Sequence, residues 1–248
     1  MSETSIVPSE RKFSAVVFDF DGTLVDSFQM MFSNYVSELL KRLPNISETE
    51  IIALSQKFLT EETKEGMKNP KKLVLKIFYK TSRALGLSRS ASANVTLRTA
   101  YKIQKQYNDI EVFPDAEELL KLLNESGVPS VLITLSSKKH VIEILKKNDL
   151  DRYFQIIIDK NDLDNFEKAK GIQASLIALG IDQQELSNVL ALGDLPSDIE
   201  DGKVAGVKTG AVLTGPVDAS KLLDANPDYI FTDLNDVVTI FKRDFNSN

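Results

Sequence analysis

The sequence lacks cysteine altogether and has a single histidine, His140, among its 248 residues. The absence of thiols excludes disulfides, cysteine-ligated zinc and a thiolate nucleophile. His140 lies among lysines on an expected helix, and we interpret it as a surface residue. One histidine of this kind argues against histidine-based catalysis and against a histidine zinc site.

Long apolar runs and an excess of basic residues are also missing. No apolar run reaches the ~18 residues that would span a membrane. The first 12 residues form a polar tail without the apolar segment of a signal peptide, so we expect a cytoplasmic protein with no membrane partner. The net charge of -6 and the pI of about 5.0 argue against nucleic-acid binding, because phosphate backbones require a basic face. A small phosphorylated ligand is compatible with this charge, since one metal ion can reverse the local field of a site.

The first 108 residues contain two different patterns. The apolar run SAVVFDF at residues 14–20 predicts a buried strand that Asp19 interrupts, and the following Asp-Gly-Thr predicts a turn. From residue 28 to residue 108, apolar residues recur at helical spacing and no segment has the pattern of a strand. Helices are expected near residues 28–43, 47–59, 71–85 and 91–107.

The rest of the chain alternates between strands and helices. Strands are expected at residues 128–134, 155–158, 189–192, 208–213 and 229–231. Helices are expected at 115–126, with Asp115 as N-cap, at 137–148 and at 168–179, and a polar loop and a short helix are expected after the strand at 189–192. This alternation predicts a Rossmann-like parallel sheet in a three-layer α/β/α arrangement. We therefore expect an α/β core formed by residues 1–27 and 109–248, with an all-helical cap inserted at residues 28–108.

Polar residues follow the expected strands at the ends where parallel sheets bind ligands. The first strand ends in Asp19 and Asp21, the second in Thr134, and the strand at 189–192 leads to Asp194 and Asp198. Crowded carboxylates repel one another unless a cation lies between them. Oxygen ligands of this kind suit Mg²⁺, which we expect as the cofactor.

Four segments of the sequence together resemble the haloacid dehalogenase superfamily. They are FDFDGTLVDS, the strand that ends in VLIT, the helix that begins with a lysine, and the later GDLPSD. The resemblance runs from about residue 14 to residue 241 and is closest to the phosphoglycolate-phosphatase-like branch, whose helical cap lies between the first two motifs. The FPDAEELLKLL segment after the cap also resembles that branch.

The resemblance implies a role for each motif residue at the carboxylate end of the site. Asp19 would be the nucleophile and a metal ligand. Asp21 would be the general acid and base and would offer its backbone carbonyl to the metal. Asp194 would ligate Mg²⁺, and Asp198 would complete the acidic site through water or the lysine.

The resemblance also implies that Thr134 binds the phosphoryl group and that Lys168 stabilises the phosphoryl oxygens and the nucleophile. Two positions depart from the usual family pattern. Leu135 stands where the second motif often has asparagine, and Lys168 is followed by alanine where the family often has proline. Lys170 competes with Lys168, but apolar residues at offsets 4, 8 and 11 from Lys168 place it on the buried face of its helix, and it is our choice.

These residues predict a Mg²⁺-dependent phosphatase that acts on small phosphate monoesters, such as phosphoglycolate-like, sugar or nucleotide phosphates, through a phosphoaspartate. A phosphomutase or a pyrophosphatase would use the same core residues. A non-catalytic binding protein on this fold is a third reading, although it would be expected to have lost Asp19 or Asp194. The absence of GxxxxGK[ST] argues against a P-loop nucleotide-binding protein. The sequence identifies neither the substrate nor the oligomeric state.

Overall fold

The centre of the protein is a six-stranded parallel sheet with the strand order β3-β2-β1-β4-β5-β6. The computed structural model describes residues 13–62, 70–162 and 167–246, so the polar tail expected at residues 1–12 lies outside the described residues. The strands are β1 (Ala15–Phe18), β2 (Ser130–Ile133), β3 (Phe154–Ile158), β4 (Val189–Gly193), β5 (Lys208–Val212) and β6 (Tyr229–Phe231).

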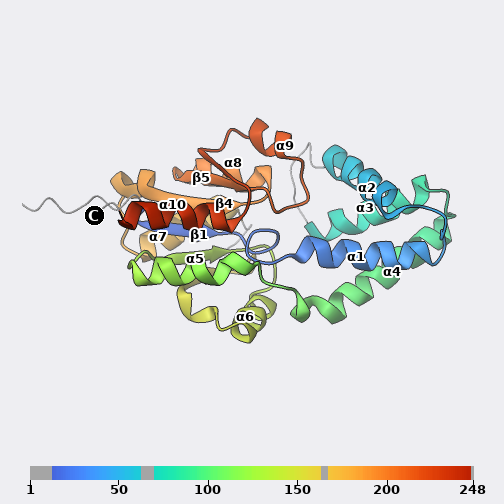
Figure 1. The fold of residues 1–248 in the computed structure, drawn as a ribbon, viewed down its shortest axis with the longest axis horizontal. Helices are drawn as coiled ribbons and strands as arrows, with labels where there is room; N and C mark the ends of the chain where they lie inside the picture. Colours follow the sequence, from blue (N-terminus) through green and yellow to red (C-terminus); the bar gives the residue numbers. More distant parts are fainter. Residues whose placement is uncertain (1–12, 63–69, 163–166, 247–248) are drawn as a thin grey trace, which may run out of the picture.

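Helices cover both faces of the sheet because successive side chains of a strand point to opposite faces. In β1, Val16 and Phe18 pack into one apolar cluster, and Ala15 and Val17 pack into another. The first cluster is covered by α5 (Pro114–Glu125), α6 (Lys138–Lys147) and α10 (Leu234–Asn246), and the second by α7 (Lys168–Ala178) and α8 (Pro196–Ala205). Figure 1 shows these layers on either side of the strands. The predicted three-layer α/β/α fold is therefore confirmed.

Several element bounds differ from the sequence-based expectations. The helix expected to start at Asp115 begins one residue earlier, because Pro114 occupies its first turn and Phe113 is the N-cap residue. Proline suits this position, since its missing N–H would have no partner there. The short helix α9 (Ala219–Asp224) and the C-terminal α10 were not among the expected helices. Short 3₁₀ segments also occur, namely η1 (Tyr107–Asp109), η2 (Asp151–Tyr153) and η3 (Gln183–Asn188).

The segment between β1 and α5 is helical and has an apolar cluster of its own. It consists of α1 (Ser27–Leu40), α2 (Glu48–Glu62), α3 (Pro70–Ala84) and α4 (Arg89–Gln106). Phe32, Tyr35 and Phe78 lie at the centre of its cluster, and the Tyr35 and Phe78 rings stack with their centroids 4.2 Å apart. In Figure 1 these four helices project from one end of the sheet, away from the C-terminus. Within the described ranges, no helix combines the length and apolar character that crossing a membrane requires.

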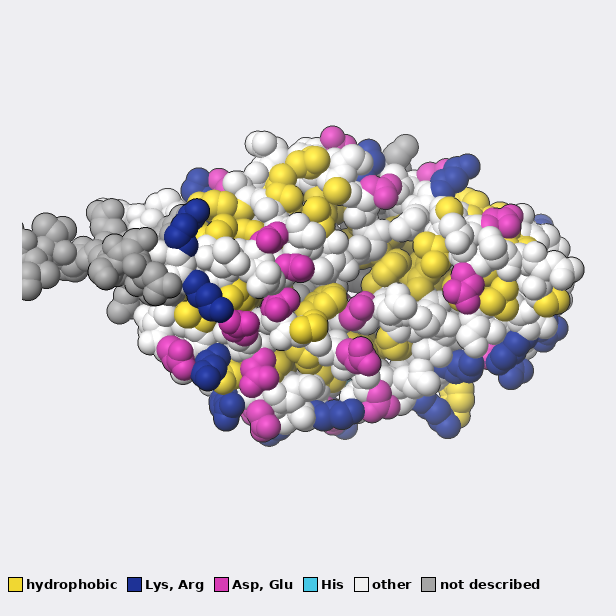
Figure 2. Space-filling model, in the orientation of Figure 1, with side chains coloured by type: hydrophobic (Ala, Val, Ile, Leu, Met, Phe, Trp, Pro, Cys, Tyr) yellow, Lys and Arg dark blue, Asp and Glu magenta, His cyan; other side chains and the backbone are white. Residues whose placement is uncertain are grey.

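Two linkers that lie side by side connect this helical segment to the sheet. Val25 and Val112 form an antiparallel bridge, and the Asp26 N–H donates to the Glu111 carbonyl at 2.9 Å. The Phe113 N–H donates to the carbonyl of Leu24 at 3.0 Å. The chain therefore enters and leaves the helical segment through two linkers that pair with each other next to the end of β1. Figure 2 shows acidic and basic side chains interspersed over the visible face, and hydrophobic side chains gathered where the helical segment meets the sheet.

A buried carboxylate connects two helices of this segment. The side chain of Glu38 in α1 is only 3% exposed. Its oxygens pair with Lys41 at 2.6 Å and with two side chains of α4, Arg98 at 3.2 Å and Lys102 at 2.6 Å. The hydrogen bonds from Lys102 and then Lys41 lower the pKa of Glu38 from 4.5 to about 2. The carboxylate therefore stabilises the folded state in its ionised form.

We expect Glu38→Gln to lower the free energy of unfolding at pH 7 by about 1–3 kcal/mol, because the substitution removes charged hydrogen bonds from a buried position. The pKa of Glu38 in the folded state lies below the usual value. Its contribution to the free energy of unfolding is therefore complete above about pH 4.5 and disappears as the pH falls toward 2. Urea denaturation at pH 7 and pH 3 measures the effect. The control Glu125→Gln, at a 61% exposed position, should change little at either pH. An equal loss at both pH values would contradict this account.

Candidate active site

Four aspartates lie where β1 and β4 end, namely Asp19, Asp21, Asp194 and Asp198. Asp19 follows β1 directly and stays in register, since its N–H donates to the Leu192 carbonyl of β4 at 3.0 Å. Asp194 follows β4, and Asp198 lies in the first turn of α8. The residues Asp19, Asp194 and Asp198 are 8%, 1% and 8% exposed. Charged groups are rarely buried to this degree without a partner, so the cluster calls for a compensating charge.

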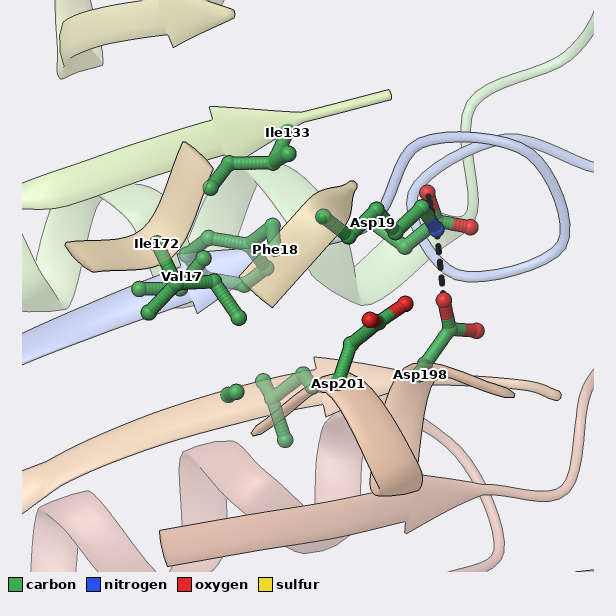
Figure 3. A pocket seen from close by; sticks show the side chains of 10 residues that line it. Val17, Phe18, Asp19, Ile133, Ile172, Asp198 and Asp201 are labelled. Carbon is green, nitrogen blue, oxygen red and sulfur yellow. Dashed lines mark hydrogen bonds and ion pairs between the residues drawn. The ribbon is translucent and has the colours of Figure 1, made fainter. Parts of the chain in front are cut away.

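Lys168 is the ammonium group that lies between two of these carboxylates. Its Nζ donates to Asp19 Oδ1 at 2.7 Å and to Asp198 Oδ1 at 2.5 Å. Figure 3 shows the Asp19 and Asp198 carboxylates approaching each other from opposite sides. The Lys168 side chain is 12% exposed, whereas that of Lys170 is 59% exposed and pairs with Glu167 at 3.1 Å. The first residue of α7 therefore faces the cluster, and the residue two positions later faces solvent.

Asp194 lies against backbone that has no room for a side chain. A Cβ atom on Gly22 would lie 2.3 Å from Asp194 Oδ2, and a Cβ on Gly215 would lie 2.1 Å from the same oxygen. Gly22 also has a φ of 86°, which favours glycine. The Thr23 hydroxyl donates to Asp194 Oδ1 at 3.2 Å. Two glycines from distant segments thus make space for this carboxylate, and Thr23 holds it.

The crowding of these groups changes their proton affinities. Burial raises the pKa of Asp19 to about 7; Lys168 opposes this rise, and the Asp198 charge adds to it. Burial and the neighbouring carboxylates of Asp198 and Asp19 also raise the pKa of Asp194 well above its usual value. Burial by itself lowers the pKa of Lys168, but Asp19 and Asp198 outweigh this effect and keep it protonated. One lysine therefore does not neutralise the cluster.

The donor set fits a hard divalent cation. Asp19, Asp194 and Asp198 each offer a carboxylate oxygen, and these oxygens lie within 4.8 Å of one another. All three are buried, and Lys168 supplies only one positive charge to them. All-oxygen sites with carboxylates suit Mg²⁺ better than softer metals. A bound cation would oppose the effects of burial and of the neighbouring carboxylates, which raise the pKa values of Asp19 and Asp194.

Asp21 lies apart from that group of three. Its Oδ2 accepts from the Ser136 hydroxyl at 2.5 Å, and its Oδ1 accepts from the Tyr107 hydroxyl at 3.2 Å. Thr134 follows β2 directly, is fully buried, and its hydroxyl oxygen accepts from the Ser136 N–H at 3.0 Å. The structure therefore brings Thr134 and Asp21 to the same edge of the sheet, with Ser136 in contact with both.

Several residues of the site were not identified from the sequence. Thr23 and the Tyr107–Ser136 pair contact site aspartates directly, and Asp201 lines a small cavity together with Asp19, Lys168 and Asp198. Burial raises the pKa of Asp201. Thr23 belongs to the same Asp-x-Asp-Gly-Thr motif as Asp19 and Asp21, so its place in the sequence is a signal for a role in the site. Tyr107 and Gly215 lie far from every motif in the sequence.

Comparison with known proteins identifies the family of this chain. The sequence profile of the haloacid dehalogenase-like hydrolases matches residues 16–212, most of the chain. This chain belongs to that family. The predicted family and the prediction of an enzyme are therefore confirmed. Family membership and the buried acidic group together fit a divalent metal.

Individual members resemble this chain along nearly its whole length. Pyrophosphatase PpaX of Oceanobacillus iheyensis is 24% identical, over 93% of this chain and 97% of that protein. Phosphoglycolate phosphatase of Pseudomonas fluorescens is 27% identical, over 90% of this chain and 78% of that protein. The crystal structure of a predicted phosphoglycolate phosphatase from Haemophilus somnus has a TM-score of 0.68 at 20% identity, over 93% of this chain and 99% of that chain.

We expect Lys168→Met to destabilise metal-free protein by about 3 kcal/mol at pH 8, because it removes the cation from buried carboxylates. The folded pKa of Asp19, already raised to about 7, should rise further without Lys168. Protonation then relieves the repulsion, so the deficit relative to wild type should shrink as the pH falls from 8 to 6. Urea denaturation in EDTA measures the stability deficit at pH 8 and at pH 6. Lys170→Met, at the exposed neighbouring position, is the matched control. A deficit independent of pH, or one shared by the control, would contradict this electrostatic role.

Proposed function

We propose that the chain is a Mg²⁺-dependent phosphatase that hydrolyses small phosphate monoesters through a phosphoaspartate on Asp19. The observation that carries the proposal is the buried group of Asp19, Asp194 and Asp198 around one lysine, at the end of the sheet of a haloacid dehalogenase-like hydrolase. Such a group combines a carboxylate nucleophile with oxygen ligands for a hard cation.

Asp19, Asp194 and Asp198 would hold the metal, together with the backbone carbonyl of Asp21. When bound, Mg²⁺ supplies positive charge that neutralises these carboxylates and the phosphoryl oxygens of the substrate. Asp198 also has a second task, since its two oxygens accept from Lys168 and from the Leu195 N–H. Asp198 thus fixes the lysine that in turn orients Asp19.

In the first step, a carboxylate oxygen of Asp19 attacks phosphorus while the bond to the leaving oxygen breaks. Asp21 gives a proton to that leaving oxygen and becomes a carboxylate. In the second step, Asp21 takes a proton from water, which attacks phosphorus and releases Asp19 and inorganic phosphate. Lys168 and the Thr134 hydroxyl hold the phosphoryl oxygens, whose negative charge they stabilise.

The helical segment at residues 28–108 is proposed as a cap that covers the site and selects the substrate. It carries its own apolar cluster, and its two linkers cross next to the end of β1, so it lies beside the loop that bears Asp19 and Asp21. The core residues act only on the phosphoryl group, so the remainder of the substrate has to be recognised elsewhere. The position of the cap beside that loop supports this role.

A pyrophosphatase is the second candidate, because relatives named pyrophosphatase PpaX match 93% of this chain. Pyrophosphate and a phosphate monoester present the same terminal phosphoryl group to Asp19. They differ in the leaving group, which is an alcohol in one case and inorganic phosphate in the other. A phosphate-release panel that includes pyrophosphate, phosphoglycolate, sugar phosphates and nucleotides distinguishes the two functions by their kcat/KM values.

We expect hydrolysis of an aryl phosphate to require Mg²⁺. Dialysis against EDTA should reduce the rate of phosphate release at least a hundredfold, because the carboxylate group loses its cation. Addition of Mg²⁺ should restore it. Full activity in excess EDTA would refute the metal-dependent mechanism.

Asp19→Asn should lower kcat at least about a thousandfold, because loss of the nucleophile removes the covalent step. The fold should be retained, as measured by thermal melting and circular dichroism. Asp224→Asn, at a position 70% exposed and paired with Lys221, is the silent control. If the Asp19 variant kept more than about a tenth of the wild-type rate, Asp19 would not be the nucleophile.

Asp21→Asn should lower kcat/KM about 10²–10⁴-fold for an alkyl phosphate, because the leaving alkoxide loses its acid. The loss should be smaller for nitrophenyl phosphate, whose leaving group needs no proton. The ratio kcat/KM reports the steps up to phosphoryl transfer, so the shared hydrolysis of the phosphoaspartate does not obscure the comparison. Equal losses for the two substrates would show that Asp21 is not the acid.

A further inference from the structure

Two hydroxyl groups from separate parts of the chain surround the Asp21 carboxylate. Ser136, just after β2, donates to Asp21 Oδ2 at 2.5 Å. Tyr107, in the 3₁₀ segment η1 that follows α4, lies 3.2 Å from Asp21 Oδ1 and 2.7 Å from the Ser136 hydroxyl oxygen. The three side chains therefore lie within hydrogen-bond distance of one another.

The hydrogens of this group are directed at the carboxylate. Each hydroxyl has one hydrogen, and an ionised carboxylate can only accept. Once Asp21 has given up its proton, Ser136 therefore donates to it, and Tyr107 donates either to Asp21 or to Ser136. Both arrangements stabilise negative charge on Asp21, because charge-assisted hydrogen bonds are stronger than neutral ones. Burial and the negative charge of Asp21 raise the pKa of Tyr107, so its hydroxyl remains a donor.

Contacts with the core hold the segment around Tyr107 in place. The neighbouring Asn108 donates to Glu143 of α6 at 2.8 Å and contacts His140 at 3.2 Å. Lys147 of α6 pairs with Asp109 at 2.9 Å. The Tyr107 ring also meets the His140 ring edge-on, with centroids 5.5 Å apart. The segment η1 is thus fastened to α6, which fixes the Tyr107 hydroxyl relative to Asp21.

We propose that Tyr107 is a positioning residue that acts with Ser136 to orient Asp21 and to stabilise the charge that develops on it. This inference rests on the proposed function. As the oxygen–phosphorus bond breaks, its electron pair goes to the leaving oxygen, which takes the Asp21 proton. Asp21 becomes an anion in that step, and the two hydroxyl donors stabilise it. In the second step they hold the same carboxylate toward water.

The test compares Tyr107→Phe, which keeps the ring and removes the hydroxyl, with the matched control Tyr35→Phe. Tyr35 is a buried tyrosine of the helical segment whose hydroxyl contacts the Phe78 carbonyl and Ser82. With an alkyl phosphate, Tyr107→Phe should lower kcat/KM about tenfold, the effect of one hydrogen bond to a charged group. With nitrophenyl phosphate the loss should stay below about threefold, because the leaving group needs little acid assistance. Tyr35→Phe should leave kcat/KM unchanged for both substrates. Tyr107→Phe should leave the inhibition constant of inorganic phosphate unchanged.

A double-mutant cycle tests whether Tyr107 acts through Asp21. In the Asp21→Asn background, Tyr107→Phe should have no further effect on the alkyl phosphate. Ser136→Ala should show the same dependence on the leaving group, which provides a second variant if Tyr107→Phe folds poorly. Equal losses for alkyl and aryl substrates, or losses that persist with Asp21→Asn, would mean a purely structural role and overturn the inference. An active wild type with a silent Tyr107→Phe would overturn it too, whereas a wild type without phosphatase activity would overturn the proposed function itself.

Discussion

The repulsion among buried carboxylates is the constraint around which this protein is organised. Asp19, Asp194 and Asp198 lie within 4.8 Å of one another with one ammonium group between them. Burial favours the neutral forms of Asp19 and Asp194, as their raised pKa values show. The arrangement is stable only because Lys168 compensates part of the charge, and a hard cation would compensate more. That imbalance favours the binding of a divalent cation among the three carboxylates.

The parallel sheet is what makes such crowding possible. β1 and β4 are neighbours, so the residues that follow them emerge at one edge although they are far apart in the chain. The glycines at positions 22 and 215 let the backbone approach Asp194 closely, where any side chain would collide with its carboxylate. The apolar strands beneath provide a rigid support, since both faces of the sheet are covered by helices. Rigid support keeps the repelling groups from moving apart.

The two parts of the chain have different tasks in this scheme. The core presents the carboxylates, the lysine and Thr134, and the helical segment has its own apolar cluster and its own buried charge at Glu38. The paired linkers and the η1 segment join the two next to Asp21. The proposed acid and base is therefore the site residue closest to the connection between them.

The sequence by itself determined the fold class, the family and the identity of the charged residues. Strand periodicity, the Asp-x-Asp-Gly-Thr turn and the GDLPSD loop are local patterns, and apolar offsets along α7 place Lys168 rather than Lys170 on the buried face. The helix α10 was not predicted, although its apolar residues recur at helical spacing, namely Leu234, Val237, Val238 and Phe241. Only the tertiary structure decided which distant residues meet. Tyr107 meets Asp21 across 86 residues, and Gly215 lies against Asp194 across 21 residues (215 − 194). No local pattern encodes these contacts, because they arise from chain packing.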